Sequence, residues 1–234
     1  MYLCGSNQSR KETLENKRYN NVEEWANTLS HGAGILLGVI AGYFLLAKAA
    51  AGAEPKWAVA CVTVYLFGML SSYVSSTWYH GSRPGKLKEL LRKFDHGAIY
   101  LHIAGTYTPF TLLVLRHAGG WGWGIFAFVW LSAIAGFILS FKKLKEHSNL
   151  ETACYVAMGW VVVIAFKPLV DVLSAHNSMD IFWWLVAGGL FYTLGAIIYL
   201  LKKIEFMHAI WHLFVLGGSV CHAYAIWLIA DFTL

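Results

Sequence analysis

The residues best suited to chemistry are two histidines near the start of the last apolar segment. His208 and His212 form an HxxxH motif. In a helix this i, i+4 spacing places both imidazoles on one face, about 6 Å apart along the axis. Such a pair can offer two nitrogen ligands to one metal ion. The motif alone is a weak signal, because a hydrogen-bonded histidine pair has the same spacing.

Three other apolar segments carry polar residues at one end. Ser76 and His80 lie four residues apart at the end of the second segment, and Asp95 begins the third. The first segment starts with three polar residues that share one helical face, namely Glu24, Asn27 and His31. Polar and ionisable groups are costly inside a bilayer, so these residues are functional candidates.

The composition indicates that a membrane surrounds these segments. Hydrophobic residues make up 58% of the 234 residues and charged residues only 13%, whereas soluble domains carry roughly 25% charged residues. The net charge of +5 does not indicate a nucleic-acid partner, because the basic residues form short clusters between apolar runs. We therefore expect a membrane protein that binds no nucleic acid.

The apolar runs predict an all-α bundle of seven transmembrane helices, because each run approaches the ~20 residues that cross a bilayer. We expect a tail over residues 1–24 and one transmembrane domain over residues 25–234. Pro109 in the third helix and Pro168 in the fifth are expected to disturb their helices. The predicted spans are 28–48, 57–80, 95–115, 121–141, 152–173, 182–201 and 207–230.

The distribution of Lys and Arg predicts the orientation. Basic residues concentrate in the N-terminal tail and in the loops after the second, fourth and sixth spans, and few lie on the other side. The positive-inside rule then places the N-terminus in the cytosol and the C-terminus outside. The first group is Arg10, Lys11, Lys17, Arg18, Arg83, Lys86, Lys88, Arg92, Lys93, Lys142, Lys143, Lys145, Lys202 and Lys203, and the second is Lys48, Lys56, Arg116 and Lys167.

This topology brings the polar groups to one membrane face, because the second span ends there and the first, third and seventh begin there. Three histidines with an open fourth position are typical of catalytic zinc. We therefore predict that zinc is bound by His80, His208 and His212.

The other polar residues at this face receive supporting roles. Asp95 is predicted to be the general base for the bound water or, alternatively, a helix N-cap. Ser76 could hydrogen-bond to that water or to a substrate carbonyl, or could join two helices. Glu24, Asn27 and His31 are expected to support the ligands.

Three further histidines fit the site less well. His96 follows Asp95 directly, but its side chain should point about 100° away from that of Asp95 along the helix. His102 lies about 10 Å deeper than Asp95, and His222 lies about 15 Å beyond His212. We expect hydrogen bonds in the bundle interior for His102 and His222.

At these residues the sequence resembles the hemolysin III / progestin-and-adipoQ-receptor family, especially its bacterial inner-membrane branch. The matching motifs are Glu24-x-x-Asn27-x-x-x-His31, Ser76-x-x-x-His80 followed by Asp95, and His208-x-x-x-His212. The resemblance covers about residues 20–230. It implies seven helices, a cytosolic N-terminus, zinc on the three histidines, and Asp95 beside the zinc-bound water. It also implies a relationship to membrane hydrolases that include alkaline ceramidases.

The leading hypothesis is a zinc-dependent intramembrane hydrolase of a lipid amide or ester. One alternative is a seven-helix receptor or sensor with a structural zinc. A hemolysin-type membrane-active protein is a second alternative, although a chain this apolar has no plausible soluble state from which to insert. A zinc transporter would need polar groups along a whole path across the membrane, and the fourth to sixth spans supply almost none. The sequence leaves the lipid and the oligomeric state open.

Overall fold

The computed structural model describes residues 20–142, 149–200 and 205–230. No strand occurs in these ranges, so the all-helical prediction is confirmed for this part of the chain. The elements are α2 (Asn21–Ala51), α3 (Pro55–Gly81), α4 (Lys86–Pro109), the π-helical segment η1 (Phe110–Val114), α5 (Trp121–Ser140), α6 (Asn149–Gly159), the 3-10 segment η2 (Val161–Ala165), α7 (Phe166–Ala175), α8 (Met179–Tyr199) and α9 (Met207–Ile229).

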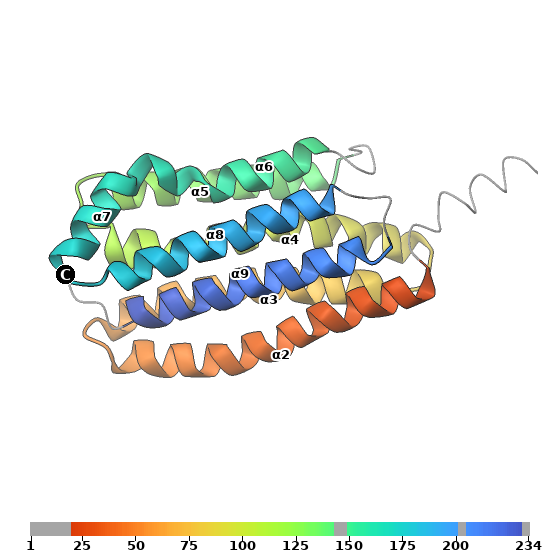
Figure 1. Ribbon diagram of the computed structural model, residues 1–234, viewed down its shortest axis with the longest axis horizontal. Helices are drawn as coiled ribbons and strands as arrows, with labels where there is room; N and C mark the ends of the chain where they lie inside the picture. Colours follow the sequence, from red (N-terminus) through yellow and green to blue (C-terminus); the bar gives the residue numbers. More distant parts are fainter. Residues whose placement is uncertain (1–19, 143–148, 201–204, 231–234) are drawn as a thin grey trace, which may run out of the picture.

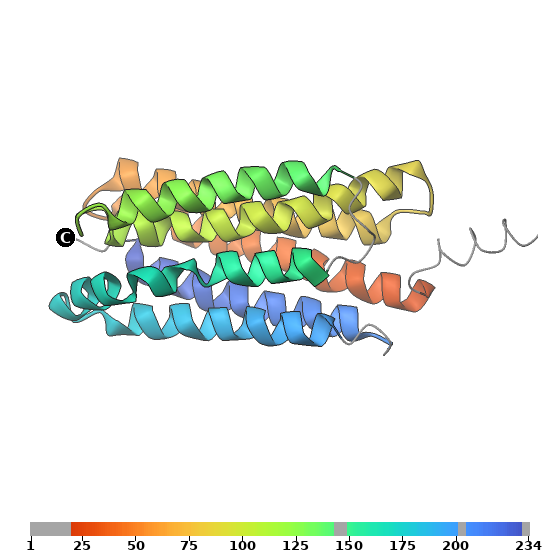
Figure 2. The same cartoon turned by 90° about the horizontal axis from the view of Figure 1, so that it is seen from above.

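The long helices run side by side along one axis, and successive helices alternate in direction (Figure 1, Figure 2). α2 packs against α3 and α9, α3 packs against α4, and α8 packs against α9. The starts of α2, α4 and α9 and the end of α3 therefore lie at the same end of the bundle. This arrangement gathers the polar helix ends that the sequence singles out.

Among the described residues, six segments are long and apolar enough to cross a membrane. They are α2, α3, α5, the stretch Leu150–Ala175, α8 and α9. Four of the predicted spans, and the stretch Leu150–Ala175 as a whole, agree with the structure to within three residues at each end. The predicted third span corresponds to α4 and η1, which are not among the six.

α4 begins nine residues before the predicted start at Asp95. Lys86, Lys88 and Arg92 were expected in a loop but lie in the first two turns of this helix. Leu91 is buried there, at 5% exposure, so these early turns pack against the bundle although they also carry charged side chains. A search for unbroken apolar runs misses such an amphipathic start.

α2 also begins early, because residues before the apolar run cap it. Asn20 Oδ1 accepts a hydrogen bond from the Glu23 amide at 2.9 Å, and the Glu23 carboxylate accepts one from the Asn20 amide at 3.0 Å. This capping box satisfies two amide donors that a helix start otherwise leaves without partners. The predicted tail over residues 1–24 thus overlaps the helix, and residues 1–19 lie outside the described residues.

The close approach of α3 and α4 depends on glycine. A Cβ on Gly68 would collide with the carbonyl of Leu101, and a Cβ on Gly105 would lie 3.0 Å from the carbonyl of Val64. Small residues allow helix backbones to approach in this way. The contact fixes α3 against α4 and so sets the relative positions of the residues that these helices carry at their polar ends.

The predicted fifth span is not one continuous helix. α6 ends at Gly159, a 3-10 segment follows, and α7 begins at Phe166, two residues before Pro168. Tyr107 of α4 stabilises the break, because its hydroxyl donates to the Gly159 carbonyl at 2.7 Å and accepts from the Val162 amide at 2.9 Å. Backbone groups freed inside a membrane need such partners. The predicted third span also changes its helix type, because the π-helical segment η1 begins directly after Pro109, the last residue of α4.

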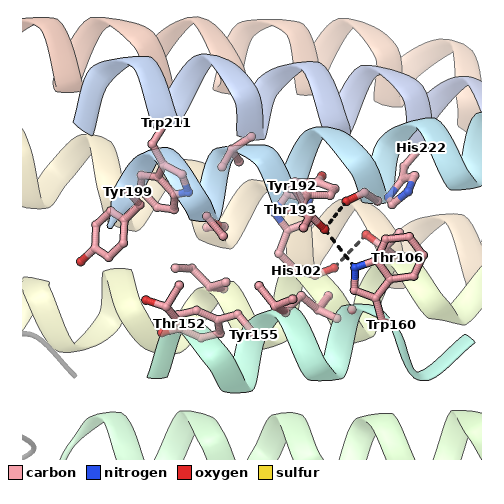
Figure 3. Close-up of a pocket in the computed structure, with 18 of the residues that line it drawn as sticks. His102, Thr106, Thr152, Tyr155, Trp160, Tyr192, Thr193, Tyr199, Trp211 and His222 are labelled. Carbon is pink, nitrogen blue, oxygen red and sulfur yellow. Dashed lines mark hydrogen bonds between the residues drawn. The ribbon is translucent and has the colours of Figure 1, made fainter. Parts of the chain in front are cut away.

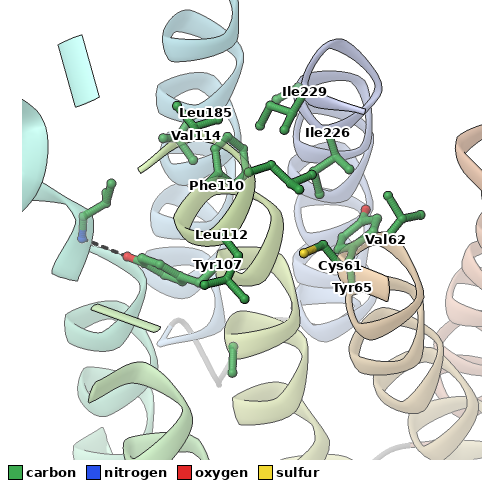
Figure 4. Close-up of a cluster of buried hydrophobic side chains, with 14 of the residues drawn as sticks. Cys61, Val62, Tyr65, Tyr107, Phe110, Leu112, Val114, Leu185, Ile226 and Ile229 are labelled. Carbon is green, nitrogen blue, oxygen red and sulfur yellow. Dashed lines mark hydrogen bonds between the residues drawn. The ribbon is translucent and has the colours of Figure 1, made fainter. Parts of the chain in front are cut away.

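A cluster of buried apolar side chains lies between the helices, and Figure 4 shows part of it, where α3, η1, α8 and α9 come together. Tyr65 of α3, Phe110 of η1 and Ile226 of α9 are all at most 3% exposed and belong to the same cluster. Because lipid tails are as apolar as these side chains, the cluster stabilises the bundle through close van der Waals packing and not through removal of apolar surface from water. The cluster extends along α3 as far as Tyr73, whose ring contacts His31 edge-on with centroids 5.1 Å apart, so apolar packing continues up to the polar residues.

Candidate metal centre

Three histidines meet where α3 ends and α9 begins. His80 lies in the last turn of α3, and His208 and His212 lie on one face of the first two turns of α9. One ligand atom from each residue lies within 4.8 Å of those of the other two. His80 Nε2 is 3.1 Å from His208 Nε2. His80 and His212 are buried, and His208 is half-buried.

The Glu24 carboxylate determines which nitrogen of His80 faces the cluster. Glu24 Oε2 lies 2.7 Å from His80 Nδ1. Because a carboxylate accepts, Nδ1 carries the hydrogen, and Nε2 of the neutral ring keeps its lone pair. Lys88 Nζ donates to Glu24 Oε1 at 2.6 Å and to the Ser82 carbonyl at 3.1 Å. A carboxylate that orients an imidazole in this way is typical of metal sites.

The start of α2 orients His212 in the same manner. His212 Nδ1 lies 2.9 Å from Ser30 Oγ and 3.3 Å from the Asn27 carbonyl. Ser30 donates its own hydrogen to that carbonyl at 2.9 Å, so its oxygen accepts from His212 Nδ1. The Nε2 lone pair of His212 therefore points away from α2. The His31 ring stacks on His212 with centroids 3.5 Å apart and planes at 14°.

These side chains fit a metal ion with nitrogen ligands. Two nitrogens bound at ~2.0–2.1 Å in a tetrahedron lie about 3.3 Å apart, close to the 3.1 Å between His80 and His208. His212 Nε2 is buried and accepts no hydrogen bond from the described residues, so it could bind an ion without losing a partner. Imidazole ligands suit zinc, copper, iron and nickel. Three of them leave one tetrahedral position open.

A cavity of about 160 Å³ opens beside the histidines. α4, α6, α8 and α9 form most of its wall, and Figure 3 shows Tyr199 and Trp211 at one end and Trp160 and His222 at the other. Along α4 and into η1 the lining residues run from Asp95 to Phe110, which is about 22 Å of helix. Most of the lining is apolar. The cavity thus connects the polar end of the bundle with its interior.

The two predicted catalytic residues are both buried but differ in position. Asp95 lines the cavity together with His31 and His208. It lies well inside α4, whose N-cap is Gly85, so the alternative of a helix N-cap is wrong. Ser76 is 1% exposed, its hydroxyl has no hydrogen-bond partner among the described residues, and it is not part of the cavity lining. The catalytic roles of both remain predictions.

Glu24, Asn27 and His31 all contact the histidine cluster, and the Asn27 amide lies 3.4 Å from His80 Nδ1. His96 instead faces α6, where its Nδ1 lies 2.8 Å from Glu151 Oε2. The sequence did not lead us to expect Ser30 or Lys88 at this site. Ser30 lies three residues after Asn27, and this helical spacing could have placed Ser30 beside Asn27 on the same side of α2.

The comparisons with known proteins identify a family for this chain. The family described as haemolysin-III related matches residues 19–223. Hemolysin-3 of Bacillus cereus is 43% identical over 197 residues, which are 84% of this chain and 87% of that protein. A hemolysin-3 homolog of Bacillus subtilis is 43% identical over 197 residues, 84% of this chain and 89% of its own. The human monocyte to macrophage differentiation factor is 31% identical over 211 residues, which are 88% and 83% of the two chains.

The family match covers the helices that carry the histidines, and six segments of the described part of the chain are long and apolar enough to span a bilayer. The family resemblance and the membrane location expected from the sequence are therefore confirmed. The chain is an integral membrane protein of the bacterial plasma membrane and belongs to the haemolysin-III-related family.

Proposed function

We propose that this protein is a zinc-dependent intramembrane hydrolase that cleaves an amide or ester bond of a lipid. The observation that carries the proposal is that His208, one of the three clustered histidines, lines a long, mostly apolar cavity whose wall also carries Asp95. An apolar cavity with a few convergent polar groups is the usual form of a small-molecule site. A lipid matches it, with the acyl chain in the cavity and the scissile bond at the histidines.

The residues have separate tasks in this reaction. Zinc, when bound, supplies a Lewis acid that polarises the carbonyl group and activates water at neutral pH. His80, His208 and His212 hold the ion, and Glu24, Ser30 and Asn27 fix two of the rings so that Nε2 faces it. The Asp95 carboxylate takes the proton from the attacking water and returns it to the leaving amine or alkoxide. Ser76 is proposed to hydrogen-bond to the carbonyl oxygen.

In this proposal the N-terminus lies in the cytosol and the C-terminus outside. The helix that begins at α4 and continues through η1 is the third of seven spans. Its charged first turns lie at the same end of the bundle as the histidines (Figure 1). With the basic residues on the cytosolic side, the scissile bond of the lipid lies near the cytosolic face. Arg10, Lys11, Lys17, Arg18, Lys143, Lys145, Lys202 and Lys203, which also support this orientation, lie outside the described residues.

The alternative is a receptor or sensor in which the same histidines hold a structural zinc. Structural zinc sites usually have four protein ligands, whereas three metal-binding side chains gather among the described residues. The open position favours the hydrolase.

Replacement of Asp95 by Asn tests the hydrolase. Asn preserves size and much of the hydrogen bonding but cannot accept the proton, so turnover of acyl lipids should fall by roughly 10²–10⁴-fold. Zinc content should stay unchanged, because the three imidazoles remain. The matched control is Asp171→Asn, at an exposed carboxylate on α7 that pairs with Lys167. Wild-type protein that cleaves no lipid in a broad panel would favour the receptor.

A further inference from the structure

A second group of polar side chains lies in the part of the cavity away from Tyr199 and Trp211 (Figure 3). Most of these groups bond to one another or to backbone. Trp160 Nε1 donates to Thr193 Oγ1 at 2.9 Å, and Thr106 Oγ1 donates to the His102 carbonyl at 2.9 Å. The lining residues of this distal polar group are His102, Thr106, Trp160, Tyr192, Thr193 and His222.

His222 is the exception in this group, because one of its nitrogens has no partner. Its Nε2 lies 3.1 Å from the Leu185 carbonyl. A carbonyl only accepts, so Nε2 carries the hydrogen and Nδ1 of the neutral ring is an acceptor. Nδ1 is buried and receives no hydrogen bond from the described residues. A buried acceptor without a donor is costly in an apolar interior. The residue is 7% exposed, and its ring lines the cavity.

The depth of His222 matches the length of an acyl chain. It lies ten residues beyond His212 on α9, which corresponds to about 15 Å along the helix. One leaflet of a bilayer, half of the ~30 Å hydrocarbon core, has the same depth. A lipid whose scissile bond lies at the metal-binding histidines would therefore bring the far part of its acyl chain to His222.

The surroundings of His222 indicate which chemical group the far part of the acyl chain carries. Phe110, Val162 and Leu185 line the same end of the cavity. The two carboxylates of the lining, Asp95 and Glu151, lie on the first turns of the cavity wall at the opposite end. An ammonium group would be unpaired here and too costly to bury. A neutral donor, such as a hydroxyl group, suits the acceptor.

We propose that the far end of this cavity is a binding subsite for an acyl chain with a distal hydroxyl group, which donates a hydrogen bond to His222 Nδ1. The subsite deepens the proposed lipid function and rests on it. It defines the substrate class as lipids with an acyl chain hydroxylated at or near its methyl end.

Binding of matched fatty acids to the purified protein in detergent tests the subsite. The probes are palmitate, α-hydroxypalmitate and ω-hydroxypalmitate, each used to displace labelled palmitate. One buried hydrogen bond is worth up to about tenfold in affinity. We expect ω-hydroxypalmitate to bind about tenfold more tightly than palmitate. The hydroxyl of α-hydroxypalmitate lies near the carboxylate and should give no such gain.

Two variants assign the preference to His222. His222→Phe keeps the ring and removes both nitrogens, so it should abolish or reverse the preference for the ω-hydroxyl. His222→Asn offers an amide donor to Leu185 and an oxygen acceptor, and should retain part of the preference. Ala196→Phe, on the lining of α8, narrows the cavity and should weaken all three ligands alike. If His222→Phe does not fold, the series on wild-type protein still decides the matter.

The outcomes separate the subsite from the proposed function. Equal binding of palmitate and ω-hydroxypalmitate would overturn the subsite and leave a lipid cavity in place. A preference that persists in His222→Phe would also overturn it. Failure of all three fatty acids to displace the label from a folded, metal-loaded protein would count against the lipid function and the subsite together.

Discussion

Replacement of Glu24 by Gln tests how the protein prepares His80 for a metal. The Glu24 carboxylate bridges His80 Nδ1 at 2.7 Å and Lys88 Nζ at 2.6 Å. Gln can still accept one hydrogen bond from His80 but has no charge. Hydrogen bonds to charged groups are roughly twice as strong as those between neutral groups. The substitution also leaves the Lys88 ammonium without its anion, beside the site that we propose to bind a cation.

The expected loss follows from the number of contacts broken. Groups that orient metal-binding histidines typically change metal affinity by 10–100-fold, equivalent to about 1.4–2.7 kcal/mol. We expect the loss of zinc affinity in Glu24→Gln to lie near the upper end of this range, because the contacts of Glu24 with both His80 and Lys88 change. Lys88→Met removes only the contact with Lys88 and should lower zinc affinity by up to about tenfold. The assay is competition for zinc with a chromophoric chelator at constant pH.

A matched control separates this effect from general loss of charge. Lys167 pairs with Asp171 at 2.7 Å on α7, at the other end of the bundle, and its side chain is 85% exposed. Lys167→Met should leave zinc affinity unchanged. If Glu24→Gln binds zinc as tightly as wild type while remaining folded, the reasoning on the orientation of His80 is wrong.

Two further predictions concern His212 and the orientation of the protein. Ser30→Ala leaves the Asn27 carbonyl, 3.3 Å away, as the partner of His212 Nδ1, so zinc affinity should fall by up to about tenfold in the same competition assay. An unchanged affinity would show that Ser30 does not orient the ring. A reporter active only outside the cytosol, fused after Leu234, should give signal; a well-expressed but silent fusion would reject the cytosolic N-terminus.

The sequence could predict the meeting of His80, His208 and His212, because helix periodicity and alternating helix direction are enough to place these residues at one end of the bundle. Residue spacing indicates on which face of a helix a side chain lies, and topology indicates how deep in the membrane it lies. The stripe of Glu24, Asn27 and His31 could be predicted for the same reason. These inferences need no knowledge of how individual side chains rotate.

Side-chain contacts between helices could not be predicted in this way. Lys88 was assigned to a loop, because charged residues interrupt the apolar pattern of α4, and its contact with Glu24 depends on that helix starting early. The Tyr107 hydroxyl bridges a break in another helix. The cavity depends on how α4, α6, α8 and α9 pack. Each of these features arises from tertiary packing, which no local pattern contains.

The metal content of the purified protein tests most directly whether the three histidines bind zinc. Elemental analysis of wild type should give one zinc per chain, and the double variant His208→Ala and His212→Ala should give none, because two of the three proposed ligands are lost. The variant should also unfold at a lower temperature in detergent, since a ligand that binds only the folded state stabilises it. Wild-type protein that never retains zinc, or a double variant that retains it equally, would contradict the account.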